Sequence, residues 1–122
     1  MLIRFLIGLI GGVLATTTLL AQDVQPLVQT KWGQNNPFNL LCPKDSVTGQ
    51  NALAGCGPIA MAQIIRYYKQ PSVSPSGDDY QWDFMNVQPA TLQEGLAIAK
   101  LVADCGVNAF TLYGREKSST QT

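Results

Sequence analysis

The sequence predicts a small α+β domain in which helices outweigh strands. Two observations support the helices: an apolar run from Pro58 to Lys69, and a helix-capping pattern at residues 91–94. A third is the segment 107–113, VNAFTLY, which is typical of a short strand. With 122 residues the chain is long enough for one small domain, and its 46% hydrophobic content excludes a disordered protein.

The first 21 residues, MLIRFLIGLIGGVLATTTLLA, have the pattern of a secretory signal peptide. Arg4 precedes an apolar run, and Ala21 ends this run at a polar boundary. Three threonines interrupt the run, which is short for a membrane span. We therefore predict a cleaved signal at residues 1–21 and an exported domain at residues 22–122, periplasmic or extracellular. A retained membrane anchor is the alternative.

The segment from residue 23 to residue 50 is expected to be irregular. It is rich in Pro, Gly, Asn and Gln, and the sequences NNP and VTG within it favour loops. Because it also carries large apolar side chains, we expect it to wrap around a core. These side chains are Trp32, Phe38, Leu40 and Leu41.

A helix is predicted from Pro58 to Lys69. Proline fits the first helical turn, where its missing N–H is not needed, and Gln70-Pro71 ends the helix. Apolar residues cover more than one face, so this helix is expected to be central and buried on more than one side. One face carries Ile59, Ala62, Ile65 and Tyr68, and another carries Met61, Ile64 and Tyr67.

The capping box Thr91–Glu94 predicts a second helix that runs to about Cys105, with Gly106 as its C-cap. The segment before it, YQWDFMN, alternates large residues and is followed by Pro89. After the predicted strand, the tail GREKSSTQT is polar. We expect the apolar stripe of the second helix to consist of Leu92, Leu96, Ala99 and Ala103.

Charge and cysteine content exclude several classes of function. Eight basic residues balance eight acidic ones, so nothing favours nucleic acid as a partner. The chain has no histidine, its three cysteines lack the close spacing of metal ligands, and no glycine-rich phosphate loop follows a strand, so we expect no cofactor. An odd number of cysteines leaves at least one thiol unpaired within a monomer. A Cys42–Cys105 bridge that leaves Cys56 free is one possibility, and three reduced thiols are the other.

Cys56 is the candidate nucleophile. It lies between Gly55 and Gly57 at the start of the first predicted helix. A thiol at a helix N-terminus is shifted toward the nucleophilic thiolate, and a neighbouring N–H can bind a developing oxyanion. Gln50, six residues upstream, could donate a second hydrogen bond to that oxyanion. The alternative is that Cys56 is a small buried residue at a turn.

Four segments together resemble the streptopain family of secreted, papain-like bacterial cysteine peptidases. GCGPIAMAQIIRYY resembles the helix that carries the catalytic cysteine, and VQPLVQTKWGQNNPFNLLCP resembles the start of the mature peptidase. YQWDFM resembles a Tyr-x-Trp-x-x-Met segment, and AIAKLVADCGVNAFTLYG resembles the following helix and strand. The resemblance covers about Val24 to Gly114.

The resemblance implies the cysteine-bearing, mainly helical lobe of a papain-like fold and a polypeptide substrate. Cys56 would be the nucleophile. Gln50 would be the side-chain donor of the oxyanion hole, with the Cys56 backbone N–H as the second donor. Trp32, Trp82 and Tyr113 would belong to the scaffold.

The family's general base is a histidine on a second, β-rich lobe, and this chain contains no histidine. We therefore expect a truncated or split peptidase that is inactive alone and pairs with a complementary C-terminal lobe. Without that lobe, one apolar face of the helix Ile59–Tyr68 would be bare. Two alternatives remain: a secreted, non-catalytic or inhibitor-like module that docks on a peptidase, and an exported structural protein. After signal cleavage no membrane contact is expected.

Overall fold

The computed structural model describes residues 22–121. The predicted signal peptide lies outside the described residues. Among the described residues, the helices are too short or too polar for any of them to cross a membrane.

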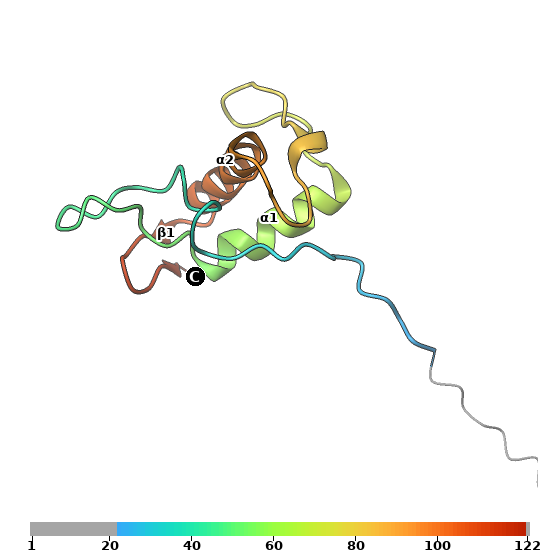
Figure 1. Ribbon diagram of the computed structural model, residues 1–122, viewed down its shortest axis with the longest axis horizontal. Coiled ribbons are helices and arrows are strands. Elements are labelled where there is room, and N and C mark those ends of the chain that lie inside the picture. The colour runs from blue at the N-terminus through green and yellow to red at the C-terminus, as the bar shows by residue number, and fades with distance from the viewer. Residues whose placement is uncertain (1–21, 122) are drawn as a thin grey trace, which may run out of the picture.

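The described chain contains two α-helices, one 3₁₀ helix and a short antiparallel ribbon. Figure 1 shows how the helices and the ribbon are arranged in space. This mixed architecture confirms the predicted α+β class. In chain order the elements are α1 (Cys56–Tyr68), η1 (Trp82–Phe84), α2 (Leu92–Asn108), β1 (Thr111–Leu112) and β2 (Ser119–Thr120).

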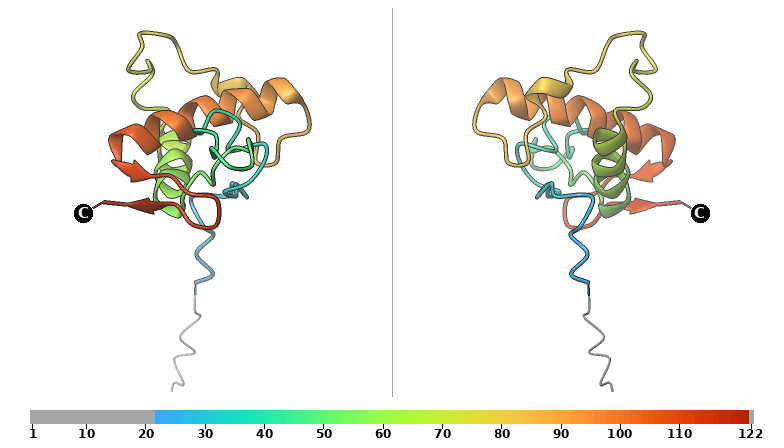
Figure 2. Two further views of the ribbon diagram at one scale, coloured as in Figure 1. Left: turned by 90° about the vertical axis from the view of Figure 1, so that its left-hand side faces the viewer. Right: turned by 90° about the vertical axis from the view of Figure 1, so that its right-hand side faces the viewer.

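The two helices cross and pack on each other, and the ribbon packs against both of them (Figure 2). Strand β1 pairs with β2 so that Thr111 lies opposite Thr120 and Leu112 opposite Ser119. The ribbon lies at the N-terminal end of α1, where a side chain on Gly57 would overlap the Thr120 hydroxyl. The strand pairing therefore brings the C-terminal part of the chain to the start of α1.

Helix α1 begins at Cys56, two residues before the predicted start, and ends at Tyr68. Its buried residues are Pro58, Ile59 and Ala62. The opposite face is open, because Ile64 is 51% and Tyr68 is 64% exposed. The prediction of burial on more than one side is thus wrong for the described chain, whereas the prediction of a bare apolar face is confirmed.

Helix α2 starts with the predicted capping box. The Thr91 hydroxyl accepts the Glu94 N–H at 3.2 Å, and the Glu94 carboxylate accepts the Thr91 N–H at 3.1 Å. The predicted end is wrong, because the helix continues to Asn108 with Gly106 inside it. Gly106 is small for a packing reason: a Cβ at this position would overlap the Tyr113 hydroxyl. Because α2 continues to Asn108, the strand predicted at residues 107–113 is shorter and covers only Thr111–Leu112.

The predicted apolar stripe of α2 is also partly wrong. Leu92 is 69% exposed and Leu96 is 41% exposed. The rotation of the helix is set by contact with α1 and the wrapping loop, which the local pattern could not show. The buried face instead consists of Ala97, Ile98, Ala99, Leu101, Val102 and Cys105.

The segment before α1 wraps around the core, as predicted. Trp32 is buried, and its indole N–H donates to the Asn86 carbonyl at 2.9 Å, which ties the segment to the loop after η1. Trp82 and Tyr113 pack against the same core while remaining partly buried. These aromatic residues are therefore in scaffold positions.

Candidate functional site

Cys56 is the first residue of α1, and its side chain is exposed. Gly55 before it has φ 89° and ψ 141°, a conformation that favours glycine, and a Cβ there would lie 3.2 Å from the Pro58 ring. The Gly55 carbonyl accepts the Ile59 N–H at 3.2 Å, which starts the helical ladder. The local sequence thus presents a thiol to solvent at the positive end of a helix.

The backbone that leads into Cys56 is held from two sides. The Ala54 N–H donates to the Gln34 carbonyl at 3.0 Å. On the other side, the Leu53 N–H donates to the Gly114 carbonyl at 3.1 Å, and the Ser118 hydroxyl donates to the Leu53 carbonyl at 2.6 Å. The segment before the thiol is therefore fixed by residues distant in sequence.

Gln50 lies in an exposed turn that closes on Asp45. The Asp45 N–H donates to the Gln50 carbonyl at 2.8 Å, and the Gln50 N–H donates to the Thr48 hydroxyl at 3.3 Å. Hydrogen bonds from the backbone and side chain of Thr48 lower the pKa of the Asp45 carboxyl. In the described part of the chain no hydrogen bond joins Gln50 to Cys56, so its role at the oxyanion hole stays a prediction.

Gln34 is an amide-bearing residue, missed by the sequence interpretation, whose backbone lies beside the segment that leads into Cys56. Its backbone carbonyl accepts the N–H of Ala54, two residues before Cys56, and the residue is half-buried. Spacing could not have identified Gln34, because it lies 22 positions upstream of Cys56. The signal in the sequence was indirect: Trp32, two residues earlier, anchors this part of the loop in the core.

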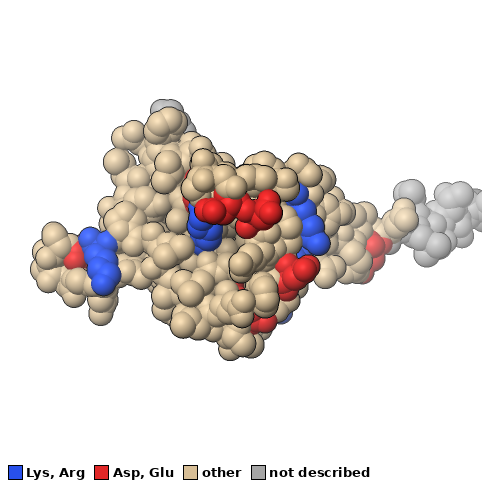
Figure 3. Space-filling model, turned by 90° about the horizontal axis from the view of Figure 1, so that it is seen from above, with Lys and Arg blue, Asp and Glu red and all other residues tan. Residues whose placement is uncertain are grey.

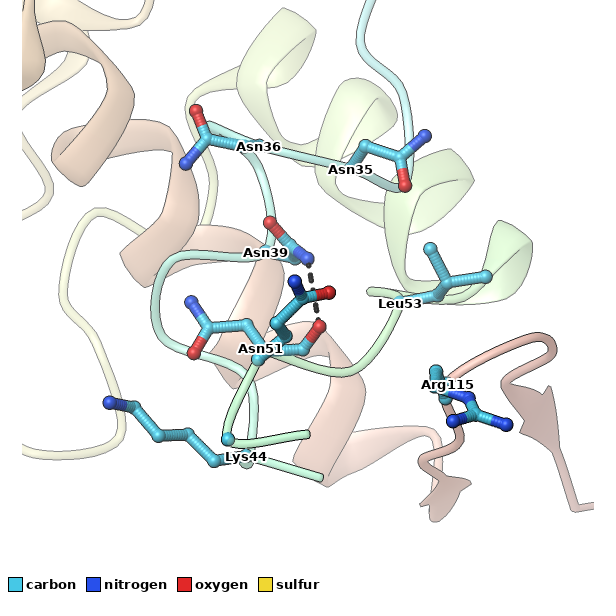
Figure 4. A pocket seen from close by; sticks show the side chains of 9 residues that line it. Asn35, Asn36, Asn39, Lys44, Asn51, Leu53 and Arg115 are labelled. Atoms are coloured by element: carbon cyan, nitrogen blue, oxygen red, sulfur yellow. Dashed lines mark hydrogen bonds between the residues drawn. The ribbon is translucent and has the colours of Figure 1, made fainter. Parts of the chain in front are cut away.

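A cavity of about 530 Å³ opens beside residues 50–53, the segment that leads toward Cys56 (Figure 4). One wall is rigid, because the Asn39 amide donates to the carbonyls of Asn51 at 3.4 Å and Ala52 at 3.1 Å. Amide side chains, which both donate and accept hydrogen bonds, dominate the polar lining of the cavity. The lining consists of Asn35, Asn36, Asn39, Lys44, Gly49, Gln50, Asn51, Leu53 and Arg115.

The charged side chains that line the cavity, Lys44 and Arg115, are both basic. Arg115 on the cavity wall lies 3.6 Å from the Glu116 carboxylate, and both side chains are exposed. On the face seen in Figure 3, acidic and basic side chains are interspersed.

The three cysteines differ sharply in their surroundings. Cys42 and Cys105 are buried and Cys56 is exposed, and all three are free thiols, so the possible Cys42–Cys105 bridge is not present. Burial raises the pKa of the Cys42 thiol, and burial with the nearby Asp104 carboxylate raises the pKa of Cys105 to about 12. Cys56 is thus the accessible thiol.

Folding stability is expected to fall as the pH rises above about 8.5, the usual pKa of an unfolded thiol. The protonated thiols of Cys42 and Cys105 are neutral, and the folded chain holds these protons more tightly than the unfolded chain. Their contribution is complete below the unfolded pKa and is lost as the pH rises toward the folded pKa. Burial and the hydrogen bond to Asp104 also raise the pKa of Tyr80, which adds to the same loss.

Urea unfolding at pH 7.5 and at pH 10 measures this loss. The free energy of unfolding should be lower at pH 10, and Cys105→Ala should reduce the difference. Equal stability at the two pH values would contradict the prediction.

Comparison with known proteins identifies the family. The model of the Peptidase C10 family matches residues 32–122. The chain is 27% identical to streptopain of Streptococcus pyogenes over 141 aligned positions, which cover 81% of this chain and 35% of streptopain. It is 36% identical over 72 positions to the thiol protease/hemagglutinin PrtT of Porphyromonas gingivalis, which cover 52% of this chain and 8% of that protein.

A solved structure gives the same result. The chain superposes on the active wild-type interpain A cysteine protease of Prevotella intermedia with a TM-score of 0.67 and 31% sequence identity. The match covers 80% of this chain and 50% of the interpain A chain, so this chain spans about half the length of that protease. The partial papain-like fold implied by the resemblance is confirmed. From its family match, its relatives and its fold, this chain belongs to the Peptidase C10 family of cysteine peptidases.

Proposed function

We propose that this chain is the nucleophile-bearing part of a cysteine peptidase that cleaves polypeptides. The observation that carries the proposal is the exposed thiol of Cys56 on the first residue of α1, in a chain of the Peptidase C10 family. The Cys56 thiolate attacks the carbonyl carbon of a peptide bond and forms a C–S bond, while the π electrons move onto the oxygen. The tetrahedral intermediate then re-forms the C=O bond as the C–N bond breaks, and the amine leaves with a proton. Water hydrolyses the resulting thioester, which releases the carboxylic acid and regenerates the Cys56 thiol.

Two glutamines are candidates for the side-chain donor that would bind the oxyanion together with the Cys56 N–H. The sequence predicts Gln50. Gln34 is the second candidate, because its backbone carbonyl accepts the Ala54 N–H and so holds this residue beside the segment that leads into Cys56. The donor of the oxyanion hole is the one whose loss reduces the rate by about 10²–10³-fold.

The proton for the leaving amine needs a general acid, and the 122 residues contain no histidine. We propose that a complementary C-terminal lobe supplies it and docks on the open face of α1. Three large side chains support this surface: Ile64 is 51%, Tyr67 is 42% and Tyr68 is 64% exposed. Burying them would remove apolar and aromatic surface from water.

The same open face favours a second candidate function, a non-catalytic module that docks on another peptidase. In that case Cys56 would be dispensable for binding. For either function we propose export, with residues 1–21 as a cleaved signal peptide, and a periplasmic or extracellular location.

Thiol labelling tests the proposed role of Cys56. Iodoacetamide should modify Cys56 of the folded chain faster than it modifies glutathione at pH 6, because the nucleophile of a cysteine peptidase is activated relative to a free thiol. Cys42 and Cys105 should react only after denaturation, since both are buried. Mass spectrometry of peptides distinguishes the three sites, and Cys56→Ser is the control. Labelling of Cys56 no faster than that of glutathione would count against an activated nucleophile.

A further inference from the structure

Ser118 connects the end of the described chain to the backbone before Cys56. Its hydroxyl donates to the Leu53 carbonyl at 2.6 Å across a separation of 65 residues, and accepts the Gly114 N–H at 3.0 Å. The Leu53 N–H in turn donates to the Gly114 carbonyl at 3.1 Å. Because the bonds close a small ring, Leu53 cannot shift without breaking at least one of them.

Ser118 is buried, with 5% of its surface exposed. In such a site a carbonyl or N–H that loses its partner cannot readily bind water instead. The side chain also supports Gly55, since a Cβ on that glycine would lie 3.5 Å from the Ser118 Cβ. Ser118 therefore contacts the residue directly before Cys56 and bonds the residue three positions before it.

The two neighbouring strands complete this support. Thr111 on β1 packs against Gly55, where a Cβ would lie 3.5 Å from the Thr111 methyl group. Thr120 on β2 packs against Gly57. The ribbon therefore contacts the glycines on both sides of Cys56, and Ser118 is its hydrogen-bonding anchor.

We propose that Ser118 is a positioning residue for Cys56, holding the Leu53–Gly55 backbone so that the thiol and its N–H stay fixed at the N-terminus of α1. The inference rests on the proposed function of Cys56. Without the hydroxyl, the Leu53 carbonyl and the Gly114 N–H lose their shared partner, and the segment before Cys56 gains freedom. A small displacement of a reacting group is enough to reduce a rate severalfold or more.

The test is the pH profile of Cys56 labelling by iodoacetamide in the full chain. Ser118→Ala should slow the labelling of Cys56 at pH 6.5 by about tenfold, because the net free energy of one hydrogen bond corresponds to a rate change of about this size. The pH profile of labelling should also move to higher pH. Cys42 and Cys105 should stay protected in this variant. Ser118→Thr keeps the hydroxyl and should restore the original profile. Ser119→Ala is the matched control, because Ser119 is the adjacent serine and is exposed.

Each other outcome has a distinct meaning. An unchanged profile in Ser118→Ala would overturn the positioning role. Labelling of Cys42 and Cys105 in that variant would also overturn it, because Ser118 would then only stabilise the fold. If Cys56 of the unmodified chain reacts no faster than glutathione, the proposed function of Cys56 fails, and the inference fails with it.

Discussion

Cys56→Ala is expected to abolish peptide cleavage by an enzyme assembled from this chain. The assay joins residues 22–122 to the remaining half of interpain A, because the two chains share 31% identity and the match covers half of interpain A. Loss of the nucleophile should reduce cleavage of a fluorogenic peptide by at least about 10⁴-fold, since the residual rate must come from binding and the oxyanion hole alone.

Cys42→Ala is the matched control, because this buried thiol lies in the core and takes no part in the proposed chemistry. It should leave cleavage measurable at a modest cost in stability. Cleavage that survives in Cys56→Ala would contradict the assignment of the nucleophile. In the same assay, Gln34→Ala and Gln50→Ala distinguish the two candidate oxyanion donors.

Leu101→Ala is expected to be the most destabilising of the simple core truncations. Leu101 on α2 is 1% exposed and belongs to the core that α2 shares with α1. Shortening it removes buried methyl groups and leaves a cavity, which costs about 2–5 kcal/mol. That is a large share of the ~5–15 kcal/mol that stabilises a typical domain. Urea denaturation followed by circular dichroism measures the change.

Leu92→Ala is the matched control for this truncation, because it makes the same chemical change at the start of the same helix. Leu92 is 69% exposed, so its loss should alter the free energy of unfolding by less than about 0.5 kcal/mol. Equal effects of the two substitutions would show that the described packing of α2 is wrong. A larger effect at Leu92 would favour the stripe predicted from the sequence.

Local chemistry explains what could be predicted. The capping box of α2 depends on Thr91 and Glu94, three positions apart, and forms as predicted. The turn into α1 depends on Gly55, whose positive φ is a local requirement. These residues place Cys56 at a helix start, whereas its exposure was left open by the sequence and is decided by the tertiary structure.

The rotation of α2 could not be predicted in the same way. Leu92 and Leu96 fit a helical period as well as Ile98 and Leu101 do, and only contact with α1 decides which of these side chains is buried. The end of α2 has the same kind of cause. Gly106 is a plausible C-cap by sequence, yet the helix continues through it to Asn108, and the absence of a side chain there leaves room for the Tyr113 hydroxyl.

By itself the sequence determined the two helices and the candidate nucleophile, because each depends on residues close together in the chain. It also indicated the family, because four separate segments resemble that family. The tertiary structure decided which residues hold Cys56 in place. Gln34 and Ser118 lie 22 positions before and 62 positions after it, and both bind its neighbouring backbone. Such contacts form only when distant segments pack together. They could not be predicted, because a hydrogen bond from a buried serine leaves no periodic pattern in the sequence.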